Sequence, residues 1–207
     1  MPTGKCLPHL VHFYSSPTIP PDRRCLDYNC SVILSSLTGG RAPLRKPRIA
    51  FGTDHGGYPL ATDLRAWFAT LDIEIIDLGA HTFDPDDDYP DYAALVARTV
   101  ANGDAEKGIA ICGSGVGASM VANKIKGVRA SVCHDIYSAH QGVEHDDMNV
   151  LCIGGRVIGI ELAKSLVEAF LAAQYSGEER HQRRLKKIKM LDLTDLPRNP
   201  DPNPLLD

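Results

Sequence analysis

The chain has 207 residues, of which 43% are hydrophobic and 23% are charged, and its formal net charge is −4. This composition excludes a chain that is disordered throughout, and the negative charge argues against a nucleic-acid partner. No apolar run reaches the length of a membrane span, so we expect no membrane partner. The length suits one α/β domain with a substantial core.

Charge divides the chain unevenly. Residues 1–48 contain seven Lys or Arg against Asp22 and Asp27, a balance of +5 that leaves −9 for the remaining 159 residues. We therefore predict an N-terminal extension at 1–47, a folded domain at 48–192 and a Pro-rich tail at 193–207. The six cysteines do not form a secreted disulfide pattern, which favours reduced thiols and a cytoplasmic location. The acid-poor extension leaves an organellar transit peptide open as an alternative.

Strand and helix patterns alternate regularly from Arg48 onward. The predicted strands cover 48–53, 73–78, 107–112, 129–134 and 149–154, and the predicted helices cover 58–71, 89–102, 116–124, 136–144, 159–173 and 178–192. Strands of nearly continuous apolar character, each followed by a helix, predict a parallel sheet that is covered on both faces. The expected fold is a three-layer, Rossmann-like α/β sandwich around five parallel strands. Ligands of such sheets bind beyond the carboxyl ends of the strands.

The segment Cys112-Gly-Ser-Gly-Val-Gly117 joins the third predicted strand to a helix. Glycines let backbone N–H groups approach an anion closely, although a plain tight turn would look the same. A dinucleotide-binding loop needs a different glycine spacing and position, and a P-loop needs Gly-Lys-Ser/Thr. Cys112 stands directly before these amides, either as a catalytic base or as a small buried side chain.

Further polar residues stand at other strand ends and on the later helices. Asp54 and His55 follow the first strand, where they could bind a sugar or a phosphate, or cap the next helix. The spacing of His140 and His145 is poor for a metal, so we assign no metal and favour an acid–base role for His145. Arg180 and Arg184 are one helical turn apart and could clamp a phosphate or form a solvated face.

Taken together, the ordered motifs resemble the family of type B ribose-5-phosphate isomerases and galactose-6-phosphate isomerase subunits. The resemblance covers residues 48–192 and rests on the following segments: Ile49-Ala-Phe-Gly-Thr-Asp-His-Gly-Gly57, Asp88-Tyr-Pro90, Gly108-Ile-Ala-Ile-Cys-Gly-Ser-Gly-Val-Gly117, Ala122-Asn-Lys124, Tyr137-Ser-Ala139, His145 to Val150, Gly155-Arg156-Val157 and Gln174 to Arg184. It implies an aldose–ketose isomerase of a small sugar phosphate, with ribose 5-phosphate as the first candidate substrate.

The resemblance also implies the roles of the site residues. Cys112 moves the proton through a cis-enediolate, Ser114 and the amides of the glycine loop hold the oxyanion, and His145 opens the sugar ring. The implied binding residues are Asp54, Tyr89 and Asp146 around the sugar, Arg156, Arg180 and Arg184, with His55 as a further candidate, at the phosphate, and Gly113, Gly115 and Gly117 in the loop. The resemblance implies no cofactor and a homodimer or dimer of dimers with shared active sites.

Three departures from the family pattern keep the substrate open. Asp146 stands where the family commonly has Asn, Gly142-Val143 replaces Ser-Arg, and Ser114 replaces Thr. An ionised Asp146 cannot donate a hydrogen bond, so a tetrose, pentose or hexose phosphate all remain candidates. Two other classes stay as alternatives: a phospho-sugar-binding subunit with a partial site, and a nucleotide-binding dehydrogenase, which lacks the loop it needs.

Overall fold

The computed structural model describes residues 45–191. In this part of the chain five strands form one parallel sheet in the order β2-β1-β3-β5-β4. The strands are β1 (Arg48–Thr53), β2 (Glu74–Asp77), β3 (Lys107–Cys112), β4 (Ala130–Val132) and β5 (Val150–Gly154). The helices are α1 (Tyr58–Phe68), α2 (Tyr89–Ala101), α3 (Val116–Ala122), α4 (Ile136–Asp146), α5 (Ile160–Ala172) and α6 (Glu179–Leu191).

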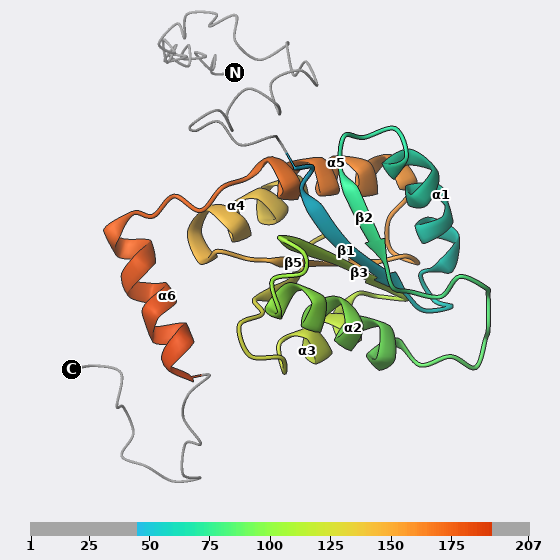
Figure 1. The fold of residues 1–207 in the computed structure, drawn as a ribbon, viewed down its shortest axis with the longest axis horizontal. Helices are drawn as coiled ribbons and strands as arrows, with labels where there is room; N and C mark the ends of the chain where they lie inside the picture. The colour runs from blue at the N-terminus through green and yellow to red at the C-terminus, as the bar shows by residue number, and fades with distance from the viewer. Residues whose placement is uncertain (1–44, 192–207) are drawn as a thin grey trace, which may run out of the picture. The chain divides into compact units, whose positions relative to one another are not determined.

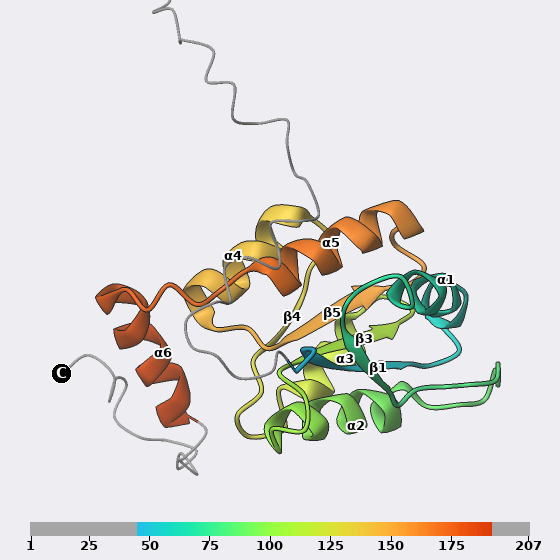
Figure 2. The same ribbon diagram turned by 45° about the horizontal axis from the view of Figure 1, so that its top comes forward.

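The helices cover both faces of the sheet, as Figures 1 and 2 show. One core joins α1, α4 and α5 to side chains such as Phe51 and Ile109, while α2 and α3 pack on the other face against Ala50 and Ala110. Successive residues of a strand point to opposite faces, so these neighbours in β1 and β3 serve separate cores. The predicted three-layer sandwich is confirmed.

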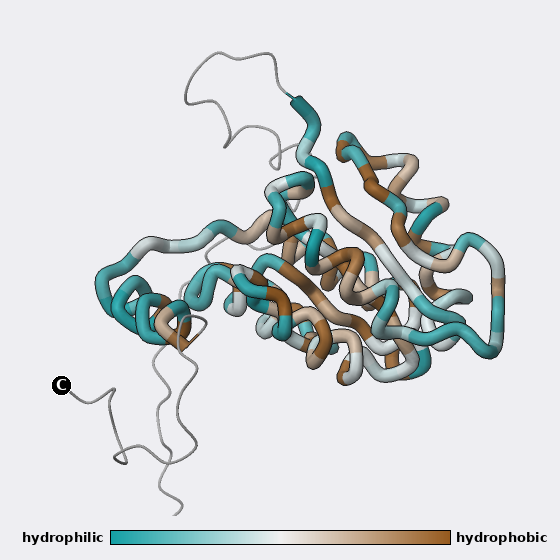
Figure 3. The backbone as a smooth tube through the Cα atoms, turned by 60° about the horizontal axis from the view of Figure 1, so that its bottom comes forward, coloured by the Kyte–Doolittle hydropathy of each residue, from teal (hydrophilic) through white to brown (hydrophobic). Residues whose placement is uncertain are grey.

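The central strands owe their position to their apolar sequence. Every residue of β5 is buried, as are all but the first residues of β1 and β3, whereas the edge strands β2 and β4 are partly exposed. Figure 3 shows hydrophobic colour along the strands and mostly hydrophilic colour on α6. Burial on both faces removes the alternation of polar and apolar residues that a half-exposed strand would need.

The strand order reverses between β1 and β3. From β1 the chain moves outward to β2, then returns across the sheet to β3 on the other side of β1. Loops at such a reversal diverge from the carboxyl ends of the two strands and leave room between them. The fold therefore places the loops after Thr53 and Cys112 side by side.

A half-buried lysine fixes the far end of α5. Lys107, at the start of β3, donates hydrogen bonds from Nζ to the carbonyl oxygens of Phe170 at 2.6 Å and Ala173 at 2.9 Å. These carbonyls have no partner within the helix because they lie at its end. Burial lowers the pKa of Lys107 to about 8. This contact holds the end of α5, and with it the linker to α6, at the amino edge of the sheet.

The predicted element boundaries differ from the structure by a few residues. Helix α1 ends at Phe68 rather than at residue 71, because the backbone tightens into a turn in which Thr70 N bonds to Trp67 O. Strand β4 has three residues rather than the six predicted. The predicted extension at 1–47 and tail at 193–207 lie almost wholly outside the described residues. Within residues 45–191, no helix combines the length and apolar character that crossing a bilayer requires.

Two leucines of α5 test the division between core and surface. Leu166 is fully buried and Leu162 is 37% exposed on the same helix. We expect Leu166→Ala to lower the free energy of unfolding by about 3 kcal/mol through lost packing and a cavity. Leu162→Ala should cost less than about 1 kcal/mol. Urea denaturation at one protein concentration measures both, and equal losses would contradict the packing described.

Candidate active site

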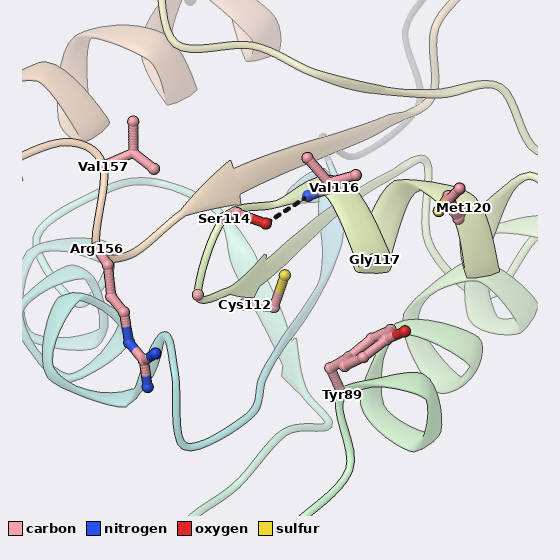
Figure 4. A pocket seen from close by; sticks show the side chains of 9 residues that line it. Tyr89, Cys112, Ser114, Val116, Gly117, Met120, Arg156 and Val157 are labelled. Carbon is pink, nitrogen blue, oxygen red and sulfur yellow. Dashed lines mark hydrogen bonds between the residues drawn. The ribbon is translucent and has the colours of Figure 1, made fainter.

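The loop after β3 forms the floor of an open pocket of about 620 Å³. Gly115 has φ of +81°, in the left-handed region that favours glycine, and its N–H lies 3.1 Å from Cys112 Sγ. Ser114 Oγ accepts a hydrogen bond from Val116 N at 3.3 Å. Figure 4 shows the thiol of Cys112 pointing into the pocket, between the side chains of Arg156 and Tyr89. The lining residues are Tyr89, Cys112, Gly113, Ser114, Val116, Gly117, Met120, Arg156 and Val157.

The turn after β5 holds Arg156 beside this loop. Gly155 N donates to Cys112 O at 2.8 Å, and Arg156 N donates to Gly113 O at 3.1 Å. The side chain of Arg156 passes the α-carbon of Gly113, since a Cβ built there would lie 3.7 Å from Arg156 Cδ. The guanidinium therefore stands at the mouth of the pocket, on the opposite side from Tyr89 (Figure 4).

Tyr89 closes the other side of the pocket. It is the first residue of α2, and its ring lies so close to Gly117 that a Cβ there would come within 2.6 Å of it. A residue with a side chain at position 117 would therefore push α2 and α3 apart. Glycine also leaves the backbone of this loop accessible to a ligand. The hydroxyl-bearing ring is 40% exposed, which leaves it accessible to a ligand.

The turn after β1 brings Asp54 and His55 against the same loop. A Cβ on Gly56 would lie 2.8 Å from Gly113 N, so the two turns touch through their backbones. Asp54 is 4% exposed, and its carboxylate accepts a hydrogen bond from Gly57 N at 3.0 Å. Burial raises the pKa of Asp54 although this hydrogen bond opposes the shift. Asp54 therefore stabilises the turn and does not cap α1, whose N-cap is Gly57.

His55 is held by a residue that the sequence did not single out. Its Nδ1 lies 2.7 Å from Asp87 Oδ1, and the same oxygen accepts its backbone N–H at 3.0 Å. The hydrogen bond to Asp87 is the main cause that raises the pKa of His55. The sequence could not identify Asp87, because it stands among the acidic residues of an irregular loop, in which no periodic pattern distinguishes a buried position from an exposed one.

Four of the predicted site residues lie at the opposite edge of the sheet. Helix α4 runs back from the carboxyl end of β4, and Asn149, which follows it, pairs with the starts of β3 and β4. His145 and Asp146 end this helix, so they lie at the amino edge. Arg180 and Arg184 follow on α6, whose linker bonds to the end of α4 through Ser176 N and Glu144 O at 2.9 Å. Within one chain they do not join the pocket around Cys112.

At the amino edge, His145 rests on a second histidine. The rings of His145 and His181 lie 4.1 Å apart at an interplanar angle of 32°. His181 is 1% exposed, and Ser176 Oγ lies 2.7 Å from its Nδ1. Burial, followed by the charge of His145, lowers the pKa of His181 and so favours its neutral form. Gln141 Nε2 lies 2.6 Å from His145 Nδ1 and fixes the ring from the other side.

Arg180 and Arg184 of α6 face solvent in the described chain. Arg180 bonds through Nε to Glu178 at 2.9 Å, and both side chains are more than half exposed. Arg184 is exposed one turn later, while His181 and Leu185 form the buried side of the helix. The spacing of His181 and Leu185 at i and i+4 could have identified this buried side from the sequence.

The histidines of α4 and the one that follows β4 do not lie together. His134 accepts a hydrogen bond from Gly154 N at the carboxyl edge, whereas His140 and His145 lie on α4. Among the described residues, the compact group of acidic and histidine side chains is Asp54, His55 and Asp87, whose polar atoms lie within 4.8 Å of one another. Their mutual hydrogen bonds and those to Gly57 account for this closeness.

A family model described as Ribose/Galactose Isomerase matches residues 49–188. The chain belongs to this family. It is 47% identical over 145 residues to ribose-5-phosphate isomerase B of Escherichia coli, covering 70% of this chain and 96% of that protein. It is 37% identical over 135 residues to D-erythrulose-4-phosphate isomerase 2 of Mycolicibacterium smegmatis, covering 63% and 88%.

A solved structure of ribose-5-phosphate isomerase B from Mycoplasma genitalium with bound ribulose-5-phosphate has the same fold. The TM-score is 0.67 at 40% sequence identity, over 70% of this chain and 96% of the other. The family and the enzyme class expected from the sequence, an isomerase, are thereby confirmed.

Thiol chemistry tests the position of Cys112. All three cysteines of the described chain are buried, but Cys112 lines the pocket, whereas burial raises the pKa of Cys133 and of Cys152. We expect iodoacetamide to alkylate Cys112 faster than the other two cysteines of the folded domain at neutral pH, because the thiolate is the reacting form. Peptide mass spectrometry over a time course measures the three rates. Equal rates for all three would show that the pocket does not expose Cys112.

Proposed function

We propose that the protein interconverts ribose 5-phosphate and ribulose 5-phosphate, with Cys112 as the base. The observation that carries this proposal is the thiol of Cys112 at the floor of an open pocket, next to the backbone N–H of Gly115 at 3.1 Å. The similarity to ribose-5-phosphate isomerase B of Escherichia coli supports the same substrate. The cytoplasmic location stays a prediction.

The proposed reaction moves one proton between neighbouring carbons. The Cys112 thiolate removes the proton from C2 of the open-chain aldose, and the electrons of that C–H bond form the C1–C2 double bond of a cis-enediolate. The thiol then returns the proton to C1, while the C2 hydroxyl gives up its proton and becomes the carbonyl and the C1 oxygen gains that proton and becomes the hydroxyl. No net oxidation occurs and the thiolate is regenerated.

The glycine loop stabilises the negative charge of the enediolate, which the thiolate itself cannot do. The α-proton of a sugar is weakly acidic, so the barrier falls mainly by stabilising the enediolate. Backbone N–H groups fixed in place before the reaction cost no reorganisation when the charge develops. We assign this task to the amides of the loop from Gly113 to Gly117 and to the Ser114 hydroxyl.

The remaining residues come from a second copy of the chain in this proposal. His145, Asp146, Arg180 and Arg184 lie at the amino edge, away from the pocket of their own chain. Val116 and Met120, beside the pocket, are 52% and 66% exposed, which is typical of apolar residues that a partner covers. In a symmetric dimer each chain can give its amino edge to the other chain's pocket. His145 then opens the sugar ring, and the two arginines bind the phosphate with Arg156.

Two observations leave the identity of the substrate open to test. The relatives include a D-erythrulose-4-phosphate isomerase, and Asp146 places a carboxylate beside His145. An ionised Asp146 accepts hydrogen bonds but donates none, so its partner on the substrate is a hydroxyl group, which a tetrose, pentose or hexose phosphate can each offer. The second candidate function is a phospho-sugar-binding subunit that needs an unlike partner, since one chain alone does not complete the site.

A panel of four-, five- and six-carbon aldose phosphates tests the proposed function. We expect turnover of ribose 5-phosphate that exceeds the turnover of the tetrose and hexose phosphates. NMR spectra of the reaction mixture identify the ketose that forms. Binding of the whole panel without turnover would instead favour the partial-site subunit.

Replacing the base tests the mechanism. Cys112→Ala should lower kcat by about a thousandfold or more, because no other group at the pocket floor can take the α-proton. The dissociation constant for substrate, measured by calorimetry, should change by less than about threefold. Cys133→Ala is the matched control and should retain turnover. Unchanged turnover in Cys112→Ala would overturn the assignment of the base.

A further inference from the structure

Asp87 connects the loop before α2 to the turn after β1. Its side chain is only 7% exposed, although the neighbouring Asp86 and Asp88 face solvent. Oδ1 accepts hydrogen bonds from both the backbone N–H and the ring Nδ1 of His55. A buried carboxylate destabilises the fold unless it is paired. Here one histidine supplies both donors to Oδ1, while Oδ2 is buried and accepts no hydrogen bond from residues 45–191.

This geometry determines which atom of His55 is available to a ligand. An ionised carboxylate only accepts hydrogen bonds, so the proton on Nδ1 belongs to the bond with Asp87. Within residues 45–191 the hydrogen bonds of His55 involve its backbone N–H and Nδ1, and Nε2 makes none. The ring of Phe83 meets the imidazole edge-on at 6.4 Å and limits its rotation. Nε2 is therefore the atom of His55 that remains for a bound molecule.

The two carboxylates near His55 both favour its charged form. Asp87 and Asp54 are the carboxylates that act on it, and both favour the imidazolium; burial of the ring opposes them. Beyond Asp87 lies Tyr92, whose pKa is raised by burial and then by the charge of Asp87. Arg156 is the cation of the adjacent turn and stands across Gly113. The direct bond to Asp87 is the strongest of these influences on His55.

We propose that Asp87 is a positioning residue that holds His55 as an imidazolium, so that Nε2–H binds the phosphate of the substrate beside Arg156. The inference rests on the proposed function, which gives His55 a phosphorylated ligand. A phosphate ester becomes a dianion above a pH of about 6, while an ordinary histidine loses its charge near a pH of about 6.5. Without Asp87, the range in which both partners are charged would nearly vanish. With Asp87, that range extends to higher pH.

The test compares the full-length protein with Asp87→Asn and with Asp86→Asn. Both variants remove one negative charge from the same loop, but only Asp87 contacts His55. Imidazole NMR signals, followed from a pH of about 5.5 to about 9, report the titration of His55, which His55→Gln assigns by loss of one signal. The KM for ribose 5-phosphate and the dissociation constant of inorganic phosphate are measured over the same range. Thermal melting checks that each variant is folded.

In the unchanged protein His55 should titrate above its ordinary value, and in Asp87→Asn it should titrate lower. At mildly alkaline pH, Asp87→Asn should raise KM and the dissociation constant of phosphate roughly three- to tenfold, with a smaller effect at acidic pH. Asp86→Asn should match the unchanged protein in all three measurements.

Equal behaviour of the two variants would overturn the proposal, as would titration of His55 at or below its ordinary value in the unchanged protein. The second result needs no variant, so it decides the question even if Asp87→Asn does not fold. Failure of the proposed function is seen separately, because the NMR titration and phosphate binding do not require turnover.

Discussion

Three turns, one after each of β1, β3 and β5, lie backbone against backbone at the carboxyl edge of the sheet. Gly56 meets Gly113 so closely that a side chain on Gly56 would come within 2.8 Å of a backbone nitrogen, and Gly155 meets Gly57 at the same distance. Hydrogen bonds from Gly155 N and Arg156 N to the β3 loop lock the arrangement. The thiol, the loop amides and Arg156 keep their places because these backbones touch. A single added methyl group at either glycine would separate them.

The sheet divides the proposed chemistry between its two edges. The carboxyl edge holds Cys112, the proposed base, and the loop amides that we assign to the oxyanion, while the amino edge holds His145 and the arginines of α6. Two anchors fix the amino edge: Lys107, bound to the end of α5, and buried His181, stacked on His145. Lys107 is half-buried and His181 is fully buried, and each has at least one hydrogen-bond partner that fixes its position. A dimer that joins unlike edges would bring the two halves together without moving either one.

Much of the fold follows from local sequence, because continuous apolar strands and amphipathic helices each predict their own burial. The loop from Cys112 to Gly117 could also be identified, since glycine spacing is a local property. The separation of His145 from Cys112 was not visible, because which edge a helix end reaches depends on the strand order β2-β1-β3-β5-β4. The partnership of Asp87 with His55 was equally hidden, since 32 residues separate them and only the folded sheet brings them together.

The central claim is that one active site combines Cys112 of one chain with His145 of another. Differently tagged chains that carry Cys112→Ala and His145→Gln, co-expressed and purified through both tags, give a hybrid dimer with one intact site. Each variant alone should be inactive, and the hybrid should recover about half the turnover of the unchanged dimer. A hybrid of Cys112→Ala with a chain carrying both substitutions has no intact site and should stay inactive. If the first hybrid is as inactive as its parents, the site does not combine Cys112 and His145 from different chains, and the account is wrong.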